Sequence, residues 1–336
     1  MIAVTGANGF VGRVLCDQLL SQRFGVRRLI RSASGSHGTV TQIGDINPKT
    51  DWSTALDGIS TVIHCAARAH VMNDCATDSL AAYRSVNVGG TRRLAEQAVA
   101  CGVKRLVYLS SVKVNGDKTE VDKPLLSPGL PSSSTDWAKQ YFTPFQTPVP
   151  KDNYGISKWE AEQALWQVAQ ETSLEVVVVR SPLVYGPGVR SNFLRLMRMV
   201  QRGWSLPFGL VNNRRSMVAL DNLVDLLIRC VESPKSSGQT FMVSDGQDLS
   251  TPELVRGLAD VMGVPARLLP VPHWMLHVSG KLMGRQAEIE RLIGSLQVDI
   301  SHTCTTLDWT PPISVEEGLR RAAEWFVQEH KVRAWR

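Results

Sequence analysis

Tyr154 and Lys158 are the two residues whose types and spacing point most directly to chemistry. They lie four positions apart in DNYGISKWEAE, residues 152–162, and residues at i and i+4 share one face of a helix. A lysine ammonium beside a phenol stabilises the phenolate, so it lowers the phenol pKa from about 10 toward the range of a working acid or base. Surface helices carry the same spacing, so the pair alone leaves a structural role open.

A pair of hydroxyls follows a β-branched run in LSSVKVNG, residues 109–116. Ser110 and Ser111 fall at the carboxyl end of a predicted parallel strand, which is the edge where open α/β sheets bind their ligands. A serine hydroxyl at that edge can hydrogen-bond to a reacting oxygen. The sequence therefore predicts that a serine joins Tyr154 and Lys158 in one site.

The elements that must position these residues alternate between short β-branched runs and longer amphipathic segments, a pattern typical of β-α-β units. We predict strands at 2–5, 26–30, 60–65, 105–110, 175–180 and 240–245, and helices at 9–22, 79–102, 157–171, 192–203, 251–263 and 314–330. The fold class is α/β, a Rossmann doubly wound parallel sheet with a smaller mixed α/β C-terminal substrate domain. The dinucleotide-binding domain is expected at 1–180 plus about 215–245, and the substrate domain at 181–214 and 246–336.

The composition of the 336-residue chain, with 43% apolar and 20% charged residues, is that of a globular protein. The net charge of +6 is spread without a run of basic residues, which favours a small anionic ligand over nucleic acid. Six cysteines without C-x-x-C spacing indicate reduced thiols and no cysteine metal site. We read no signal peptide and no membrane span, so we expect a cytoplasmic protein with no membrane partner and no metal.

A glycine loop, TGANGFVG, follows the first predicted strand and opens the first predicted helix. Gly6, Gly9 and Gly12 allow a tight turn and a close approach to a pyrophosphate, which the helix N-terminus attracts. At the end of the second strand, LIRS has Arg31 and Ser32 and no acid. An arginine there accommodates a 2′-phosphate, so NADP (as NADPH) is favoured over NAD.

With these motifs in place, the chain resembles the extended short-chain dehydrogenase/reductase family, the NAD-dependent epimerases and dehydratases, over nearly its whole length. Within that family it is most similar to nucleotide-sugar 4-epimerases and 4-ketoreductases. The resemblance rests on TGANGFVG, GDI (44–46), HCAA (64–67), NVGGT (87–91), LSS (109–111), YGISK (154–158), YGPG (185–188) and RSMVALDNLVD (215–225). It implies that Ser111, Tyr154 and Lys158 are catalytic.

The resemblance also implies a set of binding residues and a homodimer. The implied cofactor-binding residues are Gly6, Gly9, Phe10, Val11, Gly12, Arg31, Ser32, Asp45, Ile46, Ala66, Ala67, Asn87, Tyr154, Lys158 and Pro182. Ser111, Asn192 and Arg215 are the implied substrate residues, the last two for the nucleotide and diphosphate.

The chain departs from the family pattern at several points. Val112 and Lys113 follow Ser111 where 4,6-dehydratases carry an Asp-Glu pair, so dehydration is disfavoured. Leu183 stands where many epimerases have an Asn, and a second diphosphate arginine near 288–295 has no clear assignment. The long segment 117–152, rich in Pro and Ser, is expected to be a lid or a subunit contact.

Three functions follow. The first is an NADPH-dependent 4-ketoreductase of a UDP-4-keto-6-deoxy-N-acetylhexosamine, resembling the enzymes that form UDP-N-acetylquinovosamine for lipopolysaccharide O-antigen and other surface polysaccharides. The alternative is a UDP-sugar 4-epimerase acting on UDP-glucose or UDP-N-acetylglucosamine. The third, from another class, is a catalytically silent cofactor-binding structural subunit, against which the intact Ser111, Tyr154 and Lys158 argue.

Overall fold

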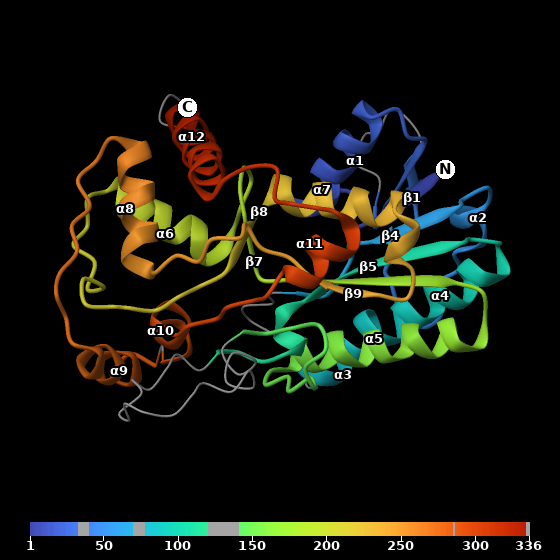
Figure 1. Ribbon diagram of the computed structural model, residues 1–336, viewed down its shortest axis with the longest axis horizontal. Helices are drawn as coiled ribbons and strands as arrows, with labels where there is room; N and C mark the ends of the chain where they lie inside the picture. The colour runs from blue at the N-terminus through green and yellow to red at the C-terminus, as the bar shows by residue number, and fades with distance from the viewer. Residues whose placement is uncertain (33–39, 70–77, 120–140, 285, 334–336) are drawn as a thin grey trace.

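A seven-stranded, all-parallel sheet forms the centre of one half of the molecule (Figure 1). The computed structural model describes residues 1–32, 40–69, 78–119, 141–284 and 286–333. The sheet order is β3-β2-β1-β4-β5-β6-β9. Its strands are β1 Ile2–Thr5, β2 Val26–Ile30, β3 Val40–Gln42, β4 Thr61–His64, β5 Arg105–Ser111, β6 Glu175–Ser181 and β9 Thr240–Met242. The chain reverses its direction across the sheet between β1 and β4, where doubly wound folds bind ligands, so the predicted fold class is confirmed.

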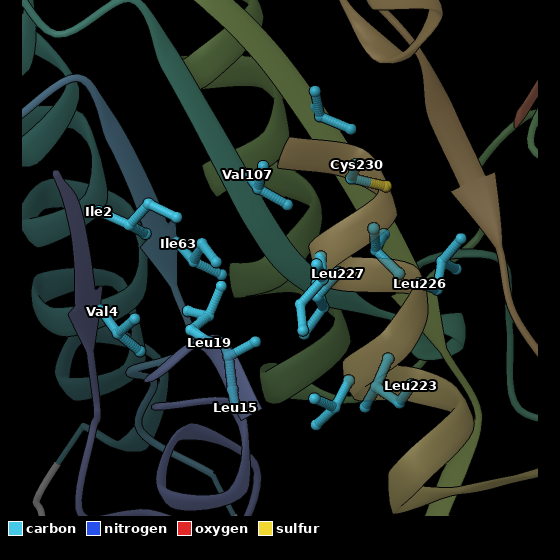
Figure 2. Close-up of a cluster of buried hydrophobic side chains, with 14 of the residues drawn as sticks. Ile2, Val4, Leu15, Leu19, Ile63, Val107, Leu223, Leu226, Leu227 and Cys230 are labelled. Carbon is cyan, nitrogen blue, oxygen red and sulfur yellow. The ribbon is translucent and has the colours of Figure 1, made fainter. Parts of the chain in front are cut away.

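Helices cover both faces of this sheet (Figure 1). On one face, α1 (Phe10–Ser21) and α7 (Leu220–Glu232) pack their buried leucines on Ile2, Val4, Ile63 and Val107 of the strands (Figure 2). The other face is covered by α2 (Ser53–Leu56), α4 (Gly90–Ala100) and α5 (Asn153–Glu171). Because both faces are buried, the inner strands β1, β4 and β6 are mostly apolar.

The single helix predicted at 79–102 is instead three consecutive elements. These are α3 (Ser79–Tyr83), a π-helical turn (Arg84–Gly89) and α4. Gly89 and Gly90 lie so close to the segment after β3 that a Cβ there would approach Pro48 Cγ at 2.5 Å and Ile46 Cγ2 at 2.4 Å. The apolar spacing alone did not distinguish a π turn, which in proteins often marks a functional site.

The remaining elements form a second cluster around a small parallel sheet of β7 (Leu183–Tyr185) and β8 (Met217–Ala219). Around it lie α6 (Ser191–Gln201), α8 (Thr251–Met262), α9 (His273–Leu282), α10 (Gln286–Ile293) and α12 (Val315–Arg333), while α11 (Ser301–Leu307) packs near β9. The predicted strand 240–245 ends at Met242, because the Asp245 backbone turns away to donate to Met217 O at 3.0 Å. The domain boundaries stay a prediction.

The flanks of the long segment 117–152 are tied to the chain at 295–299. Thr119 N donates to Ser295 O at 2.9 Å and Phe142 N to Gln297 O at 2.8 Å. Residues 120–140 lie outside the described residues, so the prediction of a lid or subunit contact stays untested. Within the described ranges, no helix combines the length and apolar character needed to cross a bilayer.

Candidate active site

The predicted site residues gather where the parallel strands end. Ser111 is the last residue of β5 and pairs in register with Ser181 of β6, which precedes Pro182, a buried residue. The glycine loop follows β1, and Ala66 and Ala67 follow β4. The carboxyl edge of the sheet therefore brings together residues from the whole first half of the sequence.

Tyr154 and Ser111 are in contact. Asp152 caps α5 by accepting from Gly155 N at 2.7 Å, so the helix begins just before Tyr154 and presents it to the end of β5. Ser111 forms a side-chain hydrogen bond with Tyr154, and the Tyr154 ring meets that of Tyr83 edge-on at 6.2 Å. The hydroxyl of Ser111 thus lies where it can share one substrate oxygen with the phenol.

Lys158 lies one turn further along α5 and is buried against the sheet. Its Nζ donates to Leu109 O at 2.7 Å and lies 4.0 Å from the centre of the Tyr108 ring. Burial lowers the pKa of Lys158 to about 7, although Glu162 opposes this shift. Near neutral pH the ammonium is therefore only partly charged in the protein without ligand.

Burial also raises the pKa of Tyr154 above its ordinary value, and the nearby Asp152 and Tyr83 raise it further. The hydrogen bond from Ser111 acts in the opposite direction. The sequence predicted a lowered pKa for this phenol. The structure differs because the phenol is desolvated beside an acidic residue, while Lys158 is itself buried and readily neutral.

His64, part of the HCAA motif, connects β1 to α4 beside Lys158. Its Nδ1 lies 2.6 Å from Thr5 Oγ1 and its Nε2 3.0 Å from Thr91 Oγ1. Burial, with the Lys158 charge adding to it, lowers the pKa of His64 to about 3, so the ring is neutral. Thr5 Oγ1 also accepts from Ala66 N at 3.1 Å, which links the ends of β1 and β4.

The three glycines of the loop have no room for a Cβ. Gly6 has a φ of 66°, and a Cβ added at Gly12 would lie 2.2 Å from Gly6 O. Gly9 precedes α1 and offers no side chain to cap it, while Phe10 and Val11 form the first turn. This loop fits a dinucleotide pyrophosphate, because bare backbone and a helix N-terminus meet at the sheet edge.

Arg31 and Asp45 form an ion pair at the outer end of the sheet. Arg31 Nε lies 3.1 Å from Asp45 Oδ1, and the two side chains are 81% and 79% exposed. Ser32 is exposed beside them, and Ile46 packs toward α4. From the sequence, Arg31 stands at the end of β2 with no acidic neighbour. In the fold, Asp45, which follows β3, supplies an acidic partner for it.

Asn87 holds the segment after β4 to α5. Its Oδ1 accepts from Arg68 N at 2.8 Å, and its Nδ2 donates to Arg68 O at 3.1 Å and to Ser157 Oγ at 2.9 Å. The amide therefore positions the chain that follows Ala66 and Ala67.

Asn192 and Arg215 line one cavity of about 310 Å³ between the small sheet and helices α6, α8, α9 and α10. Arg215 Nη1 donates to the carbonyl oxygens of Arg291 and Gly294 at 2.7 and 3.0 Å. Burial, with the Arg291 charge adding to it, lowers the pKa of Arg215 to about 10. Arg291 also lines the cavity, so it is a candidate for the second arginine that the sequence left unassigned near 288–295.

Glu162 and Arg180 were missed by sequence reasoning. Both are buried, and Arg180 Nη2 donates to Glu162 Oε2 at 2.7 Å. The spacing of Lys158 and Glu162 at i and i+4 could have indicated that Glu162 lies on the same face of α5 as Lys158. The partner on β6 could not be found without the fold.

A glycine turn at the carboxyl edge of the parallel sheet, with a tyrosine, a lysine and a serine next to it, defines a nicotinamide dinucleotide-binding α/β enzyme. The model of the NAD dependent epimerase/dehydratase family matches residues 2–244, and the chain belongs to this family. It therefore belongs among oxidoreductases and isomerases that act on nucleotide sugars.

The chain is 45% identical over 330 residues to a UDP-glucose 4-epimerase of Vibrio cholerae, covering 97% of this chain and 95% of that protein. It is 25% identical to an N-acetyl-alpha-D-glucosaminyl-diphospho-ditrans,octacis-undecaprenol 4-epimerase of Escherichia coli O157:H7, covering 98% and 96%. Its fold is similar to that of a UDP-glucuronic acid 4-epimerase from Bacillus cereus in complex with NAD, with a TM-score of 0.74, 19% identity and coverage of 98% and 99%.

Proposed function

We propose that this chain is an NAD-dependent UDP-sugar 4-epimerase. The observation that carries the proposal is the grouping of Ser111, Tyr154 and Lys158 beside the glycine cradle. The similarity to a UDP-glucose 4-epimerase over nearly the whole chain supports it. It reverses the order predicted from the sequence, where the 4-ketoreductase came first.

Each side chain then has a role set by its place. Tyr154 removes the proton from the sugar 4-hydroxyl and later returns it, and Ser111 hydrogen-bonds to the same oxygen. Lys158 holds the nicotinamide ribose and, when protonated, stabilises the phenolate. The bound nicotinamide supplies the hydride acceptor, and later the donor, at sugar carbon 4. Because burial raises the pKa of Tyr154, its action as a base in this proposal depends on the Ser111 hydrogen bond and on the Lys158 ammonium, which both favour the phenolate.

The cavity that holds Arg215 and Arg291 takes the nucleoside diphosphate in this proposal. Guanidinium groups bind phosphate oxygens through paired N–H donors. Asn192 lies at the start of α6 and lines the same cavity. Leu183, which also lines it, follows β6 by two residues, so the cavity begins beside the strand end that pairs with Ser111.

NAD fits this proposal better than NADP. The Asp45 carboxylate already pairs with Arg31, and its negative charge would repel a 2′-phosphate. The NADP preference drawn from Arg31 alone stays a prediction.

The 4-ketoreductase is the second candidate, and the observation in its favour is the exposed guanidinium of Arg31 at the end of β2. A net reduction needs NADPH or NADH from an exchanging pool, whereas an epimerase regenerates its cofactor in each turnover. The two functions therefore differ in their need for added reductant.

The deciding experiment uses the purified chain with two substrates. One sample receives UDP-glucose or UDP-N-acetylglucosamine with catalytic NAD, and the other receives a UDP-4-keto-6-deoxy-N-acetylglucosamine with NADPH. Appearance of the 4-epimer without net consumption of cofactor supports the epimerase. NADPH oxidation in the second sample without epimer in the first would replace it by the reductase.

A further inference from the structure

Helix α9 carries an exposed apolar stripe. Trp274, Val278 and Leu282 recur at every fourth position and are 66%, 50% and 84% exposed. The opposite side of the helix is buried, and a Cβ at Gly280 would lie 2.9 Å from Ile289 Cγ1 of α10. The helix α9 therefore packs on the protein through a narrow face at Leu276 and Gly280, and its large apolar side chains point to solvent.

Neighbouring loops continue the stripe into a wider surface. Leu206 N donates to Arg267 O and Leu269 N to Leu206 O, both at 2.8 Å, so the loops 204–211 and 267–271 lie side by side. His273 Nε2 lies 3.3 Å from Leu210 O, which joins them to the start of α9. We call this region the α9 surface, and its exposed apolar residues are Trp204, Leu210, Leu269, Trp274, Met275, Val278 and Leu282. Figure 1 shows α9 with α10 at the outer end of the molecule, away from β1.

The charged residues in the segments that form the α9 surface are mostly basic, although Glu290 on the neighbouring α10 is exposed. Residues 261–287 contain neither Asp nor Glu, and the loop at 202–211 contains Arg202 and no acid. Arg202, Arg267 and Lys281 are exposed, and Arg202 lies over the Trp204 ring at 5.8 Å from its centre. Tryptophan and leucine beside lysine and arginine are typical of helices that lie in a membrane interface.

A protein partner would satisfy the apolar side chains equally well, but the charge favours a lipid surface. An extended negative plane attracts every exposed cation around the apolar residues at once. Ten residues of α helix are only about 15 Å long, half of the roughly 30 Å of a hydrocarbon core. Such a helix lies on a bilayer and does not span it.

We propose that the α9 surface docks this chain on an anionic lipid bilayer. Trp274, Val278 and Leu282 enter the boundary between headgroups and acyl chains, while Arg202, Arg267 and Lys281 contact the headgroups. Met283, which follows α9, lines the cavity with Arg215 and Arg291, so docking brings the mouth of that cavity to the membrane. Docking on a membrane differs from the prediction, made from the sequence, that the protein has no membrane partner. It does not depend on which sugar the protein acts on.

Cosedimentation with vesicles tests the docking. The full chain is mixed with vesicles of phosphatidylcholine alone or of equal parts phosphatidylcholine and phosphatidylglycerol. We expect binding to the anionic vesicles that weakens as salt shortens the Debye length from about 10 Å to about 3 Å. Trp274→Gln with Leu282→Gln should weaken binding at least about tenfold, and Lys281→Glu by about fivefold or more.

Leu20→Gln is the matched control, because Leu20 is an exposed leucine on α1, and it should bind vesicles like the wild type. Thermal melting of each variant verifies the fold, since the substituted side chains are exposed. Absence of binding to both vesicle types would overturn the proposal, as would equal binding by the variants and the wild type. Self-association that Trp274→Gln with Leu282→Gln abolishes, without vesicle binding, would assign the α9 surface to a second copy instead.

Discussion

Glu162 and Arg180 form a buried ion pair directly behind the face of α5 that carries Tyr154 and Lys158. Arg180 Nε and Nη2 donate to the Glu162 carboxylate at 3.1 and 2.7 Å, and the side chains of Arg180 and Glu162 are 3% and 0% exposed. Ser110 also donates to Glu162, and Arg180 Nη1 donates to Asn115 Oδ1 at 3.1 Å. The pair thus joins α5 to β5 and β6 one helical turn after Lys158.

Glu162→Gln should destabilise the protein by about 3 to 5 kcal/mol, because the Arg180 charge is left buried without its partner. Urea denaturation measures the change. Glu160→Gln is the control on the same helix, since it breaks only the exposed pair with Arg84 and should cost about 1 kcal/mol or less. Combining Glu162→Gln with Arg180→Met should restore part of the loss, and an additive result would contradict the pairing.

Tyr154→Phe should lower kcat by about a hundredfold or more, because it removes the acid and base hydroxyl and keeps the ring. Cofactor binding, followed by fluorescence titration, should change little. Tyr83→Phe removes the neighbouring phenol hydroxyl and keeps the edge-on ring contact, so it should affect kcat far less. Comparable losses in the two variants would remove Tyr154 from its assigned role.

Lys158 should make stability depend on pH. Its pKa is about 7 in the folded protein and about 10.4 in an unfolded chain. Between these values the unfolded state binds more protons, so the free energy of unfolding rises with pH; below about pH 7 both states are protonated and the slope vanishes. The difference in this free energy between wild type and Lys158→Met should therefore rise by up to about 1.4 kcal/mol per pH unit above pH 7. A flat difference from pH 7 to pH 9 would show that Lys158 stays charged when folded.

The strands, and the sheet edge at which Ser111, Tyr154 and Lys158 lie, could be predicted from the sequence because they depend on local patterns. Runs such as EVVVVR report burial on both faces, and β6 indeed covers Glu175–Ser181. The capping carboxylate of Asp152 and the helical spacing of Tyr154 and Lys158 are local as well. The place of Ser111 in the site could be predicted because ligands bind at the carboxyl ends of parallel strands.

Long-range pairings could not be predicted. Arg291 joins Arg215 only because Ser216 N reaches Leu296 O at 2.8 Å, which brings two distant segments together. Asp45 meets Arg31 because β2 and β3 are neighbours in the sheet. Helix α9 was missed because its outward face is apolar, so the usual alternation of polar and apolar faces is absent.

Gly12→Ala should abolish dinucleotide binding, because the new Cβ would lie 2.2 Å from Gly6 O and would force the loop apart. Isothermal titration with NAD measures the effect. Gly25→Ala is the matched control, since its Cβ would meet only Met1 at an ordinary 3.7 Å. Normal binding by the Gly12 variant would mean that the loop is not the pyrophosphate cradle.

Arg31 and Asp45 should together decide the choice of cofactor. Asp45→Asn removes the carboxylate that neutralises Arg31, so the freed guanidinium should attract a 2′-phosphate and the affinity for NADP should rise by about tenfold relative to NAD. Arg31→Ala should remove whatever NADP affinity the wild type has and leave NAD binding nearly unchanged. Titration of the three proteins with both cofactors measures this ratio. If Asp45→Asn leaves it unchanged, the exposed pair lies away from the adenosine ribose and the preference is set elsewhere in the site.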